Sequence, residues 1–554
     1  MASFVGAGDA QPPTPSHLGK GARHELSHPL LMVVAVALSG PGWAGSVLSR
    51  TKTVAFVGTE ARIVEVDVDV ATSGLPSLTI VGLPDKSVRE AEQRTRSALS
   101  STGVQWPSRR MVANLAPGTL RKEGTHFDLS IALGILAGVE HIDGARIDGW
   151  VACGELALDG SLRPVRGILA AALAARAGGH RGLICPRANA AEAALVKGLE
   201  IVPLTSLREC IEWLGDRLTP PPVAAVELPT EPCEDVAEVR GHASAKRALE
   251  VAAAGGHNLL MVGPPGSGKT MLARRLPGVL PALTLDESLE VTRIHSVAGL
   301  LGERSGLVAT RPFRSPHHHV SLAGLIGGGS GLPRPGEASL AHLGVLFLDE
   351  MSLYRKDALE ALRAPLEDGV VRIARSGGVT AFPCRFSLVG AMNPCPCGYL
   401  GDARRACRCT RHQLELHRAR LSGPLLDRID IHVTLARLEH SELLGAPATE
   451  TSADVRRRVE AARAVQCDRY DSATTTNASV SRARFEATAA LKDGARRLLR
   501  VAIESLALSG RGLDRVVRLA RTLADLGAAA TVDEDHVGEA LAYRAPERDA
   551  GMLS

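Results

Sequence analysis

Short apolar runs bounded by turn residues recur through the middle of the chain. Three of them are Leu259 to Val262, Val345 to Leu348 and Phe386 to Met392. Runs of four to seven apolar residues with no polar alternation are typical of strands buried on both faces, as in a parallel sheet between two layers of helices. The pattern therefore predicts a central α/β domain.

The first run breaks into a glycine-rich loop that fits G-x-x-x-x-G-K-[ST] at every fixed position. Glycines let successive backbone N–H groups point at phosphate oxygens, and the helix that follows presents its positive end to the same anion. Lysine reaches the β- and γ-phosphates, and threonine completes the coordination of Mg²⁺. A chance glycine-rich turn is the alternative. The expected nucleotide-binding residues are Gly263, Pro264, Pro265, Gly266, Ser267, Gly268, Lys269 and Thr270.

The second run ends in an acidic pair. Asp349 is expected to hold Mg²⁺ through water, and Glu350 to orient and polarise the attacking water. Acidic residues also end strands simply because strand ends are solvated. Their position some eighty residues after the phosphate loop favours the functional interpretation, so the sequence predicts a site for ATP and Mg²⁺.

Composition and patterning divide the rest of the chain. Residues 1–50, rich in Gly, Pro, Ser and His, are expected to be a disordered extension; their apolar stretch Pro29 to Leu38 is too short to span a membrane. A Lon-protease-like domain is expected at 51–215, a proline-rich acidic linker at 216–234, the ATPase domain at 235–440 and a helical lid at 441–554. No membrane association is expected, and a cytoplasmic location is predicted.

Local patterns predict the elements of the two outer domains. In the first, strands are expected at 54–57, 63–70, 78–81 and 111–115, helices at 85–99 and 127–137, and a hairpin at 154–167 before an alanine-rich helix. In the last, helices are expected at 454–470, 483–504 and 512–526.

Composition narrows the function classes only slightly. The 554 residues carry a net charge of +4, which is too small to indicate nucleic acid by itself. Aromatic residues make up 3%, so a base-stacking platform is not indicated. Ten cysteines in so long a chain do not resemble a secreted disulfide framework.

Four of the cysteines are clustered. The pairs Cys395/Cys397 and Cys407/Cys409 are separated by ten positions from Cys397 to Cys407. Four thiolates in one short loop suit a structural, tetrahedral Zn²⁺. Reduced structural cysteines or a redox pair are the alternatives, and His412 is a candidate replacement ligand.

Two basic stretches are candidate DNA contacts. Residues 370–382 read as a hairpin whose arginines, Arg372 and Arg375, would approach the phosphate backbone. Arg404, Arg405, Arg408 and Arg411 surround the cysteine loop. The alternative in both cases is a solvated basic surface. The triplet 317–319, three histidines without a carboxylate partner, is expected to be structural or to face a pore.

Residues 51–215 resemble the proteolytic domain of Lon proteases, whose fold is shared with a ribosomal-protein domain. The resemblance lies in residues 122–124 and 154–167. Lon proteases use a Ser–Lys dyad, but His126 aligns with the serine, and residues 168–170, Ile-Leu-Ala, stand where the lysine is expected. A nucleophile without an adjacent base is weak, so the domain is expected not to be a protease.

The central domain resembles the AAA+ ATPases of the magnesium-chelatase-like group. The motifs at 311–318, 333–342, 362–369 and 393–398 are similar to those of the ComM (YifB) family, and the resemblance covers residues 51 to 545. His319, Leu322 and residues 351–354 depart from the family pattern without touching the ATPase residues. The implied architecture is multidomain α/β: a Lon-like domain, an AAA+ α/β/α domain and a helical lid.

The resemblance also implies roles and partners. Asn393 would be a sensor beside the γ-phosphate, Arg428 the arginine finger inserted by a neighbouring subunit, and Arg511 the lid sensor, with Arg515 as its competitor. The family implies a hexameric ring and a DNA branch-migration helicase used in homologous recombination and natural transformation, acting on branched or single-stranded DNA. The alternatives are a magnesium-chelatase motor subunit that drives metal insertion into a porphyrin, and a chaperone-like protein remodeller.

Overall fold

A long antiparallel hairpin opens the described part of the chain. The computed structural model describes residues 46–223, 233–301, 306–329, 333–375, 378–402, 404–438, 450–506 and 508–544. Strand β1 (Val47–Val57) pairs along its whole length with β2 (Glu60–Val70), from Val47 opposite Val70 to Val57 opposite Glu60. The strand therefore begins four residues before the expected domain boundary, and residues 1–45 of the expected extension lie outside the described residues.

This amino-terminal module (residues 46–223) contains two sheets of three or more strands and one two-stranded sheet. The first has the order β1-β2-β4-β3, with β4 (Arg110–Ala116) and β3 (Ser77–Val81), and the second is the parallel sheet β5-β8-β9, with β5 (Trp150–Ala152), β8 (Gly182–Pro186) and β9 (Glu200–Leu204). The other elements are α1 (Lys86–Arg89), α2 (Ala91–Ser101), α3 (Asp128–Gly138), η1 (Gly144–Arg146), β6 (Glu155–Leu156), β7 (Leu162–Arg163), α4 (Ile168–Ala177), η2 (Arg187–Asn189), α5 (Ala190–Ala193) and α6 (Leu207–Leu214).

Helix α3 is buried along its entire length against the hairpin. A Cβ at Gly134 would lie 2.6 Å from Val68, and one at Gly138 would lie 2.7 Å from Val70, so only glycine allows this approach. The even-numbered valines of β2 face the helix, as period-two burial in a strand requires.

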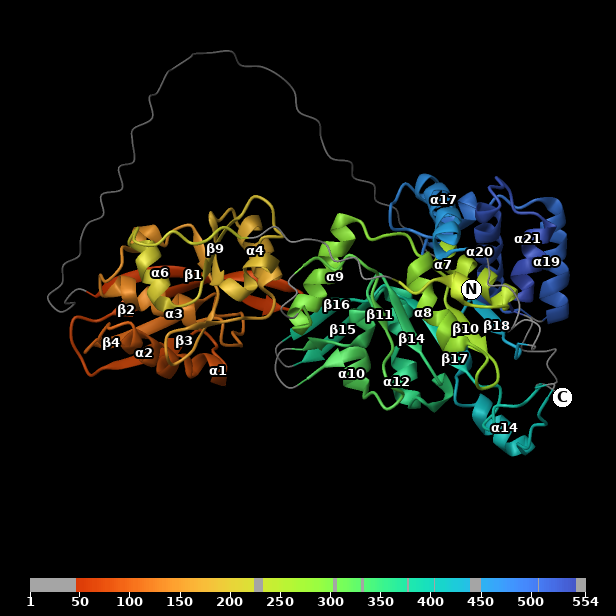
Figure 1. Ribbon diagram of the computed structural model, residues 1–554, viewed down its shortest axis with the longest axis horizontal. Helices are drawn as coiled ribbons and strands as arrows, with labels where there is room; N and C mark the ends of the chain where they lie inside the picture. The colour runs from red at the N-terminus through yellow and green to blue at the C-terminus, as the bar shows by residue number, and fades with distance from the viewer. Residues whose placement is uncertain are drawn as a thin grey trace, which may run out of the picture. The chain divides into compact units, whose positions relative to one another are not determined.

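The central module (residues 233–438) is built on a five-stranded parallel sheet of order β11-β14-β17-β10-β18 (Figure 1). Its strands are β11 (Phe313–Arg314), β14 (Val345–Leu348), β17 (Ser387–Met392), β10 (Leu259–Val262) and β18 (Ile431–Thr434). Leu259 and Met261 pack into one hydrophobic core and Leu260 into another, so the sheet is buried on both faces, as the apolar runs predict.

The central module also contains helices and short elements outside this sheet. They are η3 (Val236–Glu238), α7 (Ala243–Gly255), α8 (Lys269–Val279), α9 (Leu285–Ala298), α10 (Leu322–Ile326), β12 (Gly327–Gly328), β13 (Arg334–Pro335), α11 (Glu337–Leu340), η4 (Met351–Leu353), α12 (Lys356–Ala361), α13 (Arg363–Asp368), β15 (Val370–Arg375), β16 (Gly378–Pro383), α14 (Arg411–Arg418) and α15 (Gly423–Leu426).

The lid module (residues 450–544) is helical. It contains α17 (Ser452–Tyr470), α18 (Arg482–Thr488), α19 (Asp493–Leu506), α20 (Gly510–Leu526) and α21 (Glu534–Ala542). Val516, Leu519 and Leu523 of α20 share one hydrophobic core with Leu249 of α7 and Leu272 of α8. The lid is thus packed against the helices that flank the phosphate loop. None of the helices in the described part of the chain is both long and apolar enough to cross a bilayer.

Two expected helices are broken in the structure. The helix expected at 85–99 divides at Glu90, and Asp85 caps the first piece through the backbone N–H of Val88. The helix expected at 483–504 is interrupted after α18, where the N–H of Lys492 donates to the carbonyl of Val532 at 2.9 Å. At each break, backbone N–H groups are paired by hydrogen bonds other than those of a continuous helix. Helical periodicity in the sequence does not reveal such hydrogen bonds.

Candidate nucleotide site

The glycine-rich loop joins β10 to α8 at the carboxyl edge of the parallel sheet. Gly268 has a φ of +80° and precedes the first residue of α8, so the turn into the helix needs a residue that tolerates the left-handed region. A Cβ at Gly263 would lie 2.5 Å from the carbonyl oxygen of Leu435. The loop follows the strand and opens the helix, which is the context that a phosphate-binding loop requires.

Three strand ends converge beside this loop. The hydroxyl of Thr270 donates to Asp349 Oδ2 at 2.7 Å, and Nζ of Lys269 lies 3.3 Å from Asn393 Oδ1. Asp349 and Glu350 follow β14, and Asn393 follows β17. Parallel strands bring their carboxyl ends to one edge, so residues spread over about 130 positions form a single cluster.

The Lys269 ammonium group is folded back onto its own loop. It donates to the carbonyl oxygens of Gly263 at 2.7 Å and Pro264 at 2.9 Å. Burial lowers the pKa of Lys269, while Asp349 and Glu350 act against that shift. A phosphate in the loop would add negative charge beside this ammonium, which suits the buried lysine. The donors present therefore fit a triphosphate, and the hydroxyl and carboxylate oxygens of Thr270 and Asp349 fit Mg²⁺.

Glu350 stands at the open side of the cluster. Its backbone is in the left-handed region, with φ of +49°, and its N–H donates to Asp349 Oδ1 at 2.9 Å. A non-glycine residue in that region is uncommon and is often found at a functional site. His318 Nδ1 lies 3.7 Å from Glu350 Oε2. Sequence reasoning missed this pairing; the histidine triplet marks the segment, but nothing in it indicates the partner.

Arg428 lies at the opposite, amino edge of the sheet. It is buried, its guanidinium is paired with Glu367, and its Nη1 donates to the carbonyl of Pro424. Its own carbonyl accepts from Asn258, the residue before β10. The arginine therefore lies at the far end of the strand from the phosphate loop of the same chain.

The lid arginines lie near the same amino edge. Arg515 is paired with Asp430, the residue before β18. Burial would raise the pKa of Asp430, but Arg515 and His257 outweigh it and hold that pKa well below its usual range. The exposed Arg511 lies in the first turn of the same helix, α20. Arg428 and Arg515 line a cavity of about 850 Å³ at this edge.

The hairpin expected at 370–382 is present as β15 and β16. The strands are paired from Val370 opposite Pro383 to Arg375 opposite Gly378, and residues 376–377 of the expected turn lie outside the described residues. Arg372 is exposed and 3.3 Å from Asp368, and Arg375 is exposed.

The four clustered cysteines are brought together by the fold. Their sulfur atoms all lie within 4.8 Å of one another, and His412 is not part of this group.

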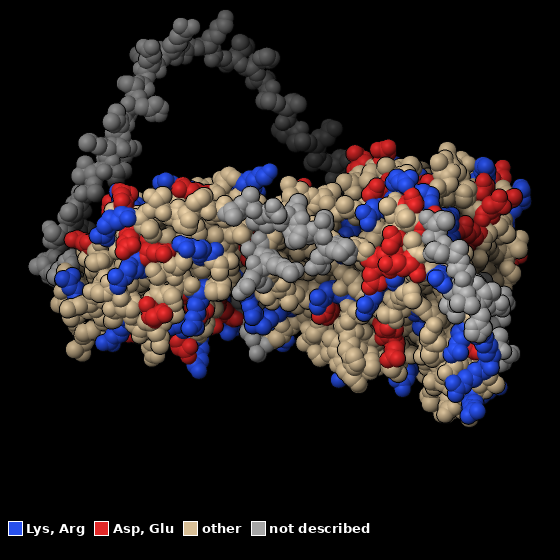
Figure 2. All heavy atoms as spheres, in the orientation of Figure 1, with Lys and Arg blue, Asp and Glu red and all other residues tan. Residues whose placement is uncertain are grey.

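The exposed arginines around the loop form a basic surface, seen in blue over the region of α14 in Figure 2: Arg404, Arg405, Arg408, Arg411, Arg418 and Arg420. The histidine triplet also brings its ring nitrogens within 4.8 Å of one another.

The positions that align with the protease dyad are His126 and residues 168–170, and the latter are buried at the start of α4. Lys122 is buried, with its ammonium donating to the carbonyl of Pro117. His126 Nε2 donates to the carbonyl of Val54 at 2.9 Å, and the neighbouring hydroxyl of Thr125 donates to Glu155. Lys122 belongs to the aligned segment 122–124 and not to the dyad positions, and its ammonium is held by a backbone carbonyl.

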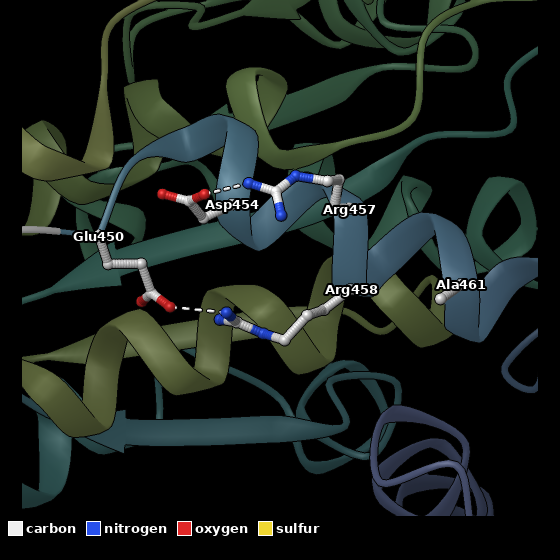
Figure 3. Close-up of a pocket in the computed structure, with 5 residues that line it drawn as sticks. All are labelled: Glu450, Asp454, Arg457, Arg458 and Ala461. Atoms are coloured by element: carbon white, nitrogen blue, oxygen red, sulfur yellow. Dashed lines mark hydrogen bonds and ion pairs between the residues drawn. The ribbon is translucent and has the colours of Figure 1, made fainter.

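A separate hollow on the lid is lined by residues other than those of the sites described above. It is lined by Glu450, Asp454, Arg457, Arg458 and Ala461 at the start of α17 (Figure 3). Its charged side chains pair with each other: Arg458 with Glu450 at 2.7 Å, and Arg457 with Asp454. Exposed pairs of this kind need no ligand to satisfy them.

Comparison with known proteins extends these observations to the whole chain. Residues 235–443 match the family "Magnesium chelatase, subunit ChlI", residues 64–189 match "Subunit ChlI of Mg-chelatase", and residues 449–544 match "Magnesium chelatase, subunit ChlI C-terminal".

Similar proteins match over nearly their full length. An uncharacterized protein of Mycobacterium tuberculosis is 43% identical over 503 residues, 90% of this chain and 98% of its own. The competence protein ComM of Haemophilus influenzae is 40% identical over 508 residues, and the uncharacterized protein YifB of Escherichia coli is 39% identical over 507, with the same coverage of 90% and 98%. The chain belongs to the ComM/YifB family of magnesium-chelatase-like proteins.

Proposed function

We propose that this chain is an ATP-hydrolysing AAA+ ring motor that moves DNA strands, acting as a branch-migration helicase in homologous recombination and natural transformation. The observation that carries the ATPase half is the convergence of Lys269, Thr270, Asp349 and Asn393 at one sheet edge. The DNA half is supported by the similarity to the competence protein ComM and by the arginine-bearing hairpin.

Each residue of the cluster has a defined part in this proposal. The backbone N–H groups of the loop and the Lys269 ammonium hold the phosphates, and Thr270 and Asp349 hold Mg²⁺, which neutralises charge on the β- and γ-phosphates when bound. Glu350 accepts a proton from the attacking water, and the Asn393 amide orients that water beside the γ-phosphate.

The position of Arg428 supports assembly into a ring. An arginine at the amino edge of the sheet cannot reach the phosphate loop of its own chain at the carboxyl edge. It would reach the site of a neighbour by leaving its partner Glu367. A guanidinium supplied in trans stabilises the charge that develops during phosphoryl transfer. Arg511 is the proposed lid sensor, with Arg515 as its competitor for that role. We infer a homo-oligomer, by family expectation a hexamer.

The hairpin β15–β16 is the proposed DNA contact. Arg372 and Arg375 are exposed on strands whose backbone groups are already paired with each other. Such a hairpin can project arginines to a phosphate backbone without unfolding, and the contact would not depend on base sequence.

ATP turnover measured with and without DNA tests the function. The proposal expects branched or single-stranded DNA to stimulate ATP hydrolysis. It also expects the protein with ATP to dissociate a labelled four-way junction by branch migration. The chelatase alternative expects no DNA effect but turnover coupled to metal insertion into a porphyrin. The remodeller alternative expects stimulation by unfolded protein.

A Glu350→Gln variant sharpens that test, because it should bind ATP and DNA together without releasing either. An intact junction, combined with no DNA association of the Glu350→Gln variant, would reject the DNA half while leaving the ATPase half standing. Absence of any ATP binding would reject both.

A further inference from the structure

The spacing of the four clustered cysteine sulfurs matches one metal ion. Cys395 Sγ lies 3.4 Å from Cys397 Sγ and 3.7 Å from Cys407 Sγ. The sulfur atoms of Cys397 and Cys407 are 3.6 Å apart. Four sulfurs bound to a tetrahedral Zn²⁺ at about 2.3 Å lie about 3.8 Å from one another. A disulfide would need a sulfur–sulfur distance of about 2.05 Å, so these cysteines are arranged as ligands of a shared centre and not as a bonded pair.

Backbone N–H groups of the loop donate hydrogen bonds to the cysteine sulfurs, which favours negatively charged thiolates. The N–H of Cys397 donates to Cys409 Sγ, and the N–H of Cys409 donates to Cys407 Sγ, both at 3.4 Å. Hydrogen bonds of this kind orient thiolates and stabilise their negative charge. Gly398 and Gly401, with φ of +86° and +76°, make the turn between the two cysteine pairs. Four soft thiolates favour Zn²⁺ and leave no open coordination position, so the site is structural.

The inner side of the same loop touches the phosphate loop. Gly398 lies so close to Pro265 that a Cβ would be 2.7 Å from its Cδ. Asn393, two residues before Cys395, holds Lys269 through its side-chain oxygen at 3.3 Å. The cysteine loop is therefore one wall of the nucleotide site.

A helix leads from the cysteines back to the same asparagine. Thr410, the residue after Cys409, caps α14 through a reciprocal hydrogen-bond pair with Gln413. His417, on the last turn of α14, is buried, and its Nε2 donates to the carbonyl of Asn393 at 3.0 Å. Asn393 is thus fixed from both ends of the cysteine loop.

We propose that the four cysteines hold one Zn²⁺, and that this metal keeps the loop seated against Pro265 and Asn393, so that the zinc site is a structural part of the nucleotide site. The metal-binding half stands on the cysteine geometry alone. The coupling half rests on the proposed ATP site and deepens it, because it names what fixes Asn393.

Metal analysis tests the first half. Protein purified without added metal should contain one zinc per chain by mass spectrometry of the metal content. Replacing the metal with Co²⁺ should give the visible absorption of a tetrahedral thiolate complex. The double variant Cys407→Ser/Cys409→Ser should lose the zinc, whereas the control Cys233→Ser/Cys467→Ser should keep it. Less than about a tenth of an equivalent of zinc in the wild type, or the absorption of an iron–sulfur cluster, would overturn the zinc assignment.

Nucleotide affinity, measured in the absence of DNA, tests the second half. Removing zinc from the wild type with a chelator should weaken binding of a fluorescent ATP analogue at least tenfold, and added Zn²⁺ should restore it. This reversal on one protein does not depend on whether the cysteine variant folds. Unchanged affinity after complete zinc loss would overturn the coupling. If the zinc-loaded wild type bound no nucleotide, the proposed ATPase function would fail, while the metal content would still decide the zinc assignment.

Discussion

His318 Nδ1 and Glu350 Oε2 lie 3.7 Å apart, although the two residues belong to different motifs. The ring of His318 lies 4.1 Å from that of His317 and 4.3 Å from that of His319, and the three rings are tilted against one another. Tyr354, whose hydroxyl donates to the carbonyl of Pro316, packs against the same imidazole. The carboxylate proposed to accept a proton from water is therefore bordered by a positioned ring.

Replacing His318 tests whether this ring positions Glu350. We expect His318→Leu, which keeps apolar bulk, to lower the kcat of ATP hydrolysis by about tenfold, because a general base that is free to rotate spends less time in reach of the water. The KM for ATP should stay within about twofold, since the phosphate loop is untouched. His319→Leu is the matched control, because it removes the adjacent, tilted imidazole of the triplet and keeps both members of the His318–Glu350 pair. Equal kcat for both variants would contradict a positioning role.

Arg428 should act on the site of a neighbouring protomer. We expect Arg428→Ala to lower ATP turnover by about a thousandfold, and Lys269→Ala to abolish it by loss of nucleotide binding. In a mixed ring, an Arg428→Ala protomer still binds ATP, and its Lys269→Ala neighbour still supplies Arg428. Mixing the two inactive proteins should therefore restore measurable turnover.

The control for this mixing experiment is Lys269→Ala combined with the double variant Lys269→Ala/Arg428→Ala, which should remain inactive. Glu367→Gln is a second control, because it removes the intrachain partner of Arg428 without removing the arginine. No recovery in the first mixture, with oligomers confirmed by sedimentation, would argue against action in trans.

The convergence of Lys269 and Thr270 with Asp349 and Asn393 could be predicted from the sequence because its parts are local. Each part is a buried strand followed by a polar residue, and parallel strands bring such ends together. The pairing of Arg428 with Glu367 and of His318 with Glu350 depends on which loops meet in space. The pattern of apolar and polar residues along the sequence does not indicate which loops meet. The same holds for the break between α18 and α19, where a backbone bond from Lys492 to Val532 replaces helical pairing.

Arg372 and Arg375 should carry part of the affinity for DNA. We expect Arg372→Ala/Arg375→Ala to weaken DNA binding and to reduce the slope of log K against log salt by up to about 1.8, at about 0.9 for each duplex phosphate that an arginine no longer neutralises. Turnover without DNA should be unchanged. The control is Arg457→Ala/Arg482→Ala, which removes two exposed lid arginines and should leave the slope as it is. Fluorescence anisotropy at several salt concentrations measures the slope, and a slope equal to that of the wild type would exclude the hairpin as a site of phosphate binding.

His126 should make the amino-terminal module less stable in acid. Burial lowers its pKa from 6.5 to about 4 in the folded chain, against the hydrogen bond to the carbonyl of Val54, which acts to raise it. Between these values the unfolded chain binds more protons than the folded chain, so the free energy of unfolding decreases as pH falls through this window. The full shift corresponds to roughly 3 kcal/mol. Because His126→Gln removes the titrating group, its stability should fall less than that of the wild type between about pH 7 and about pH 4.5.

Urea unfolding followed by tryptophan fluorescence measures this difference, since Trp150 and Trp213 pack edge to face at 5.0 Å within the same module. His141→Gln is the matched control, because His141 is an exposed histidine of that module and its removal should leave the pH dependence of the wild type intact. If His126→Gln and the wild type lost stability in parallel as the pH was lowered, another group would account for the acid sensitivity. His126 would then be a packed imidazole whose burial costs the same at either pH.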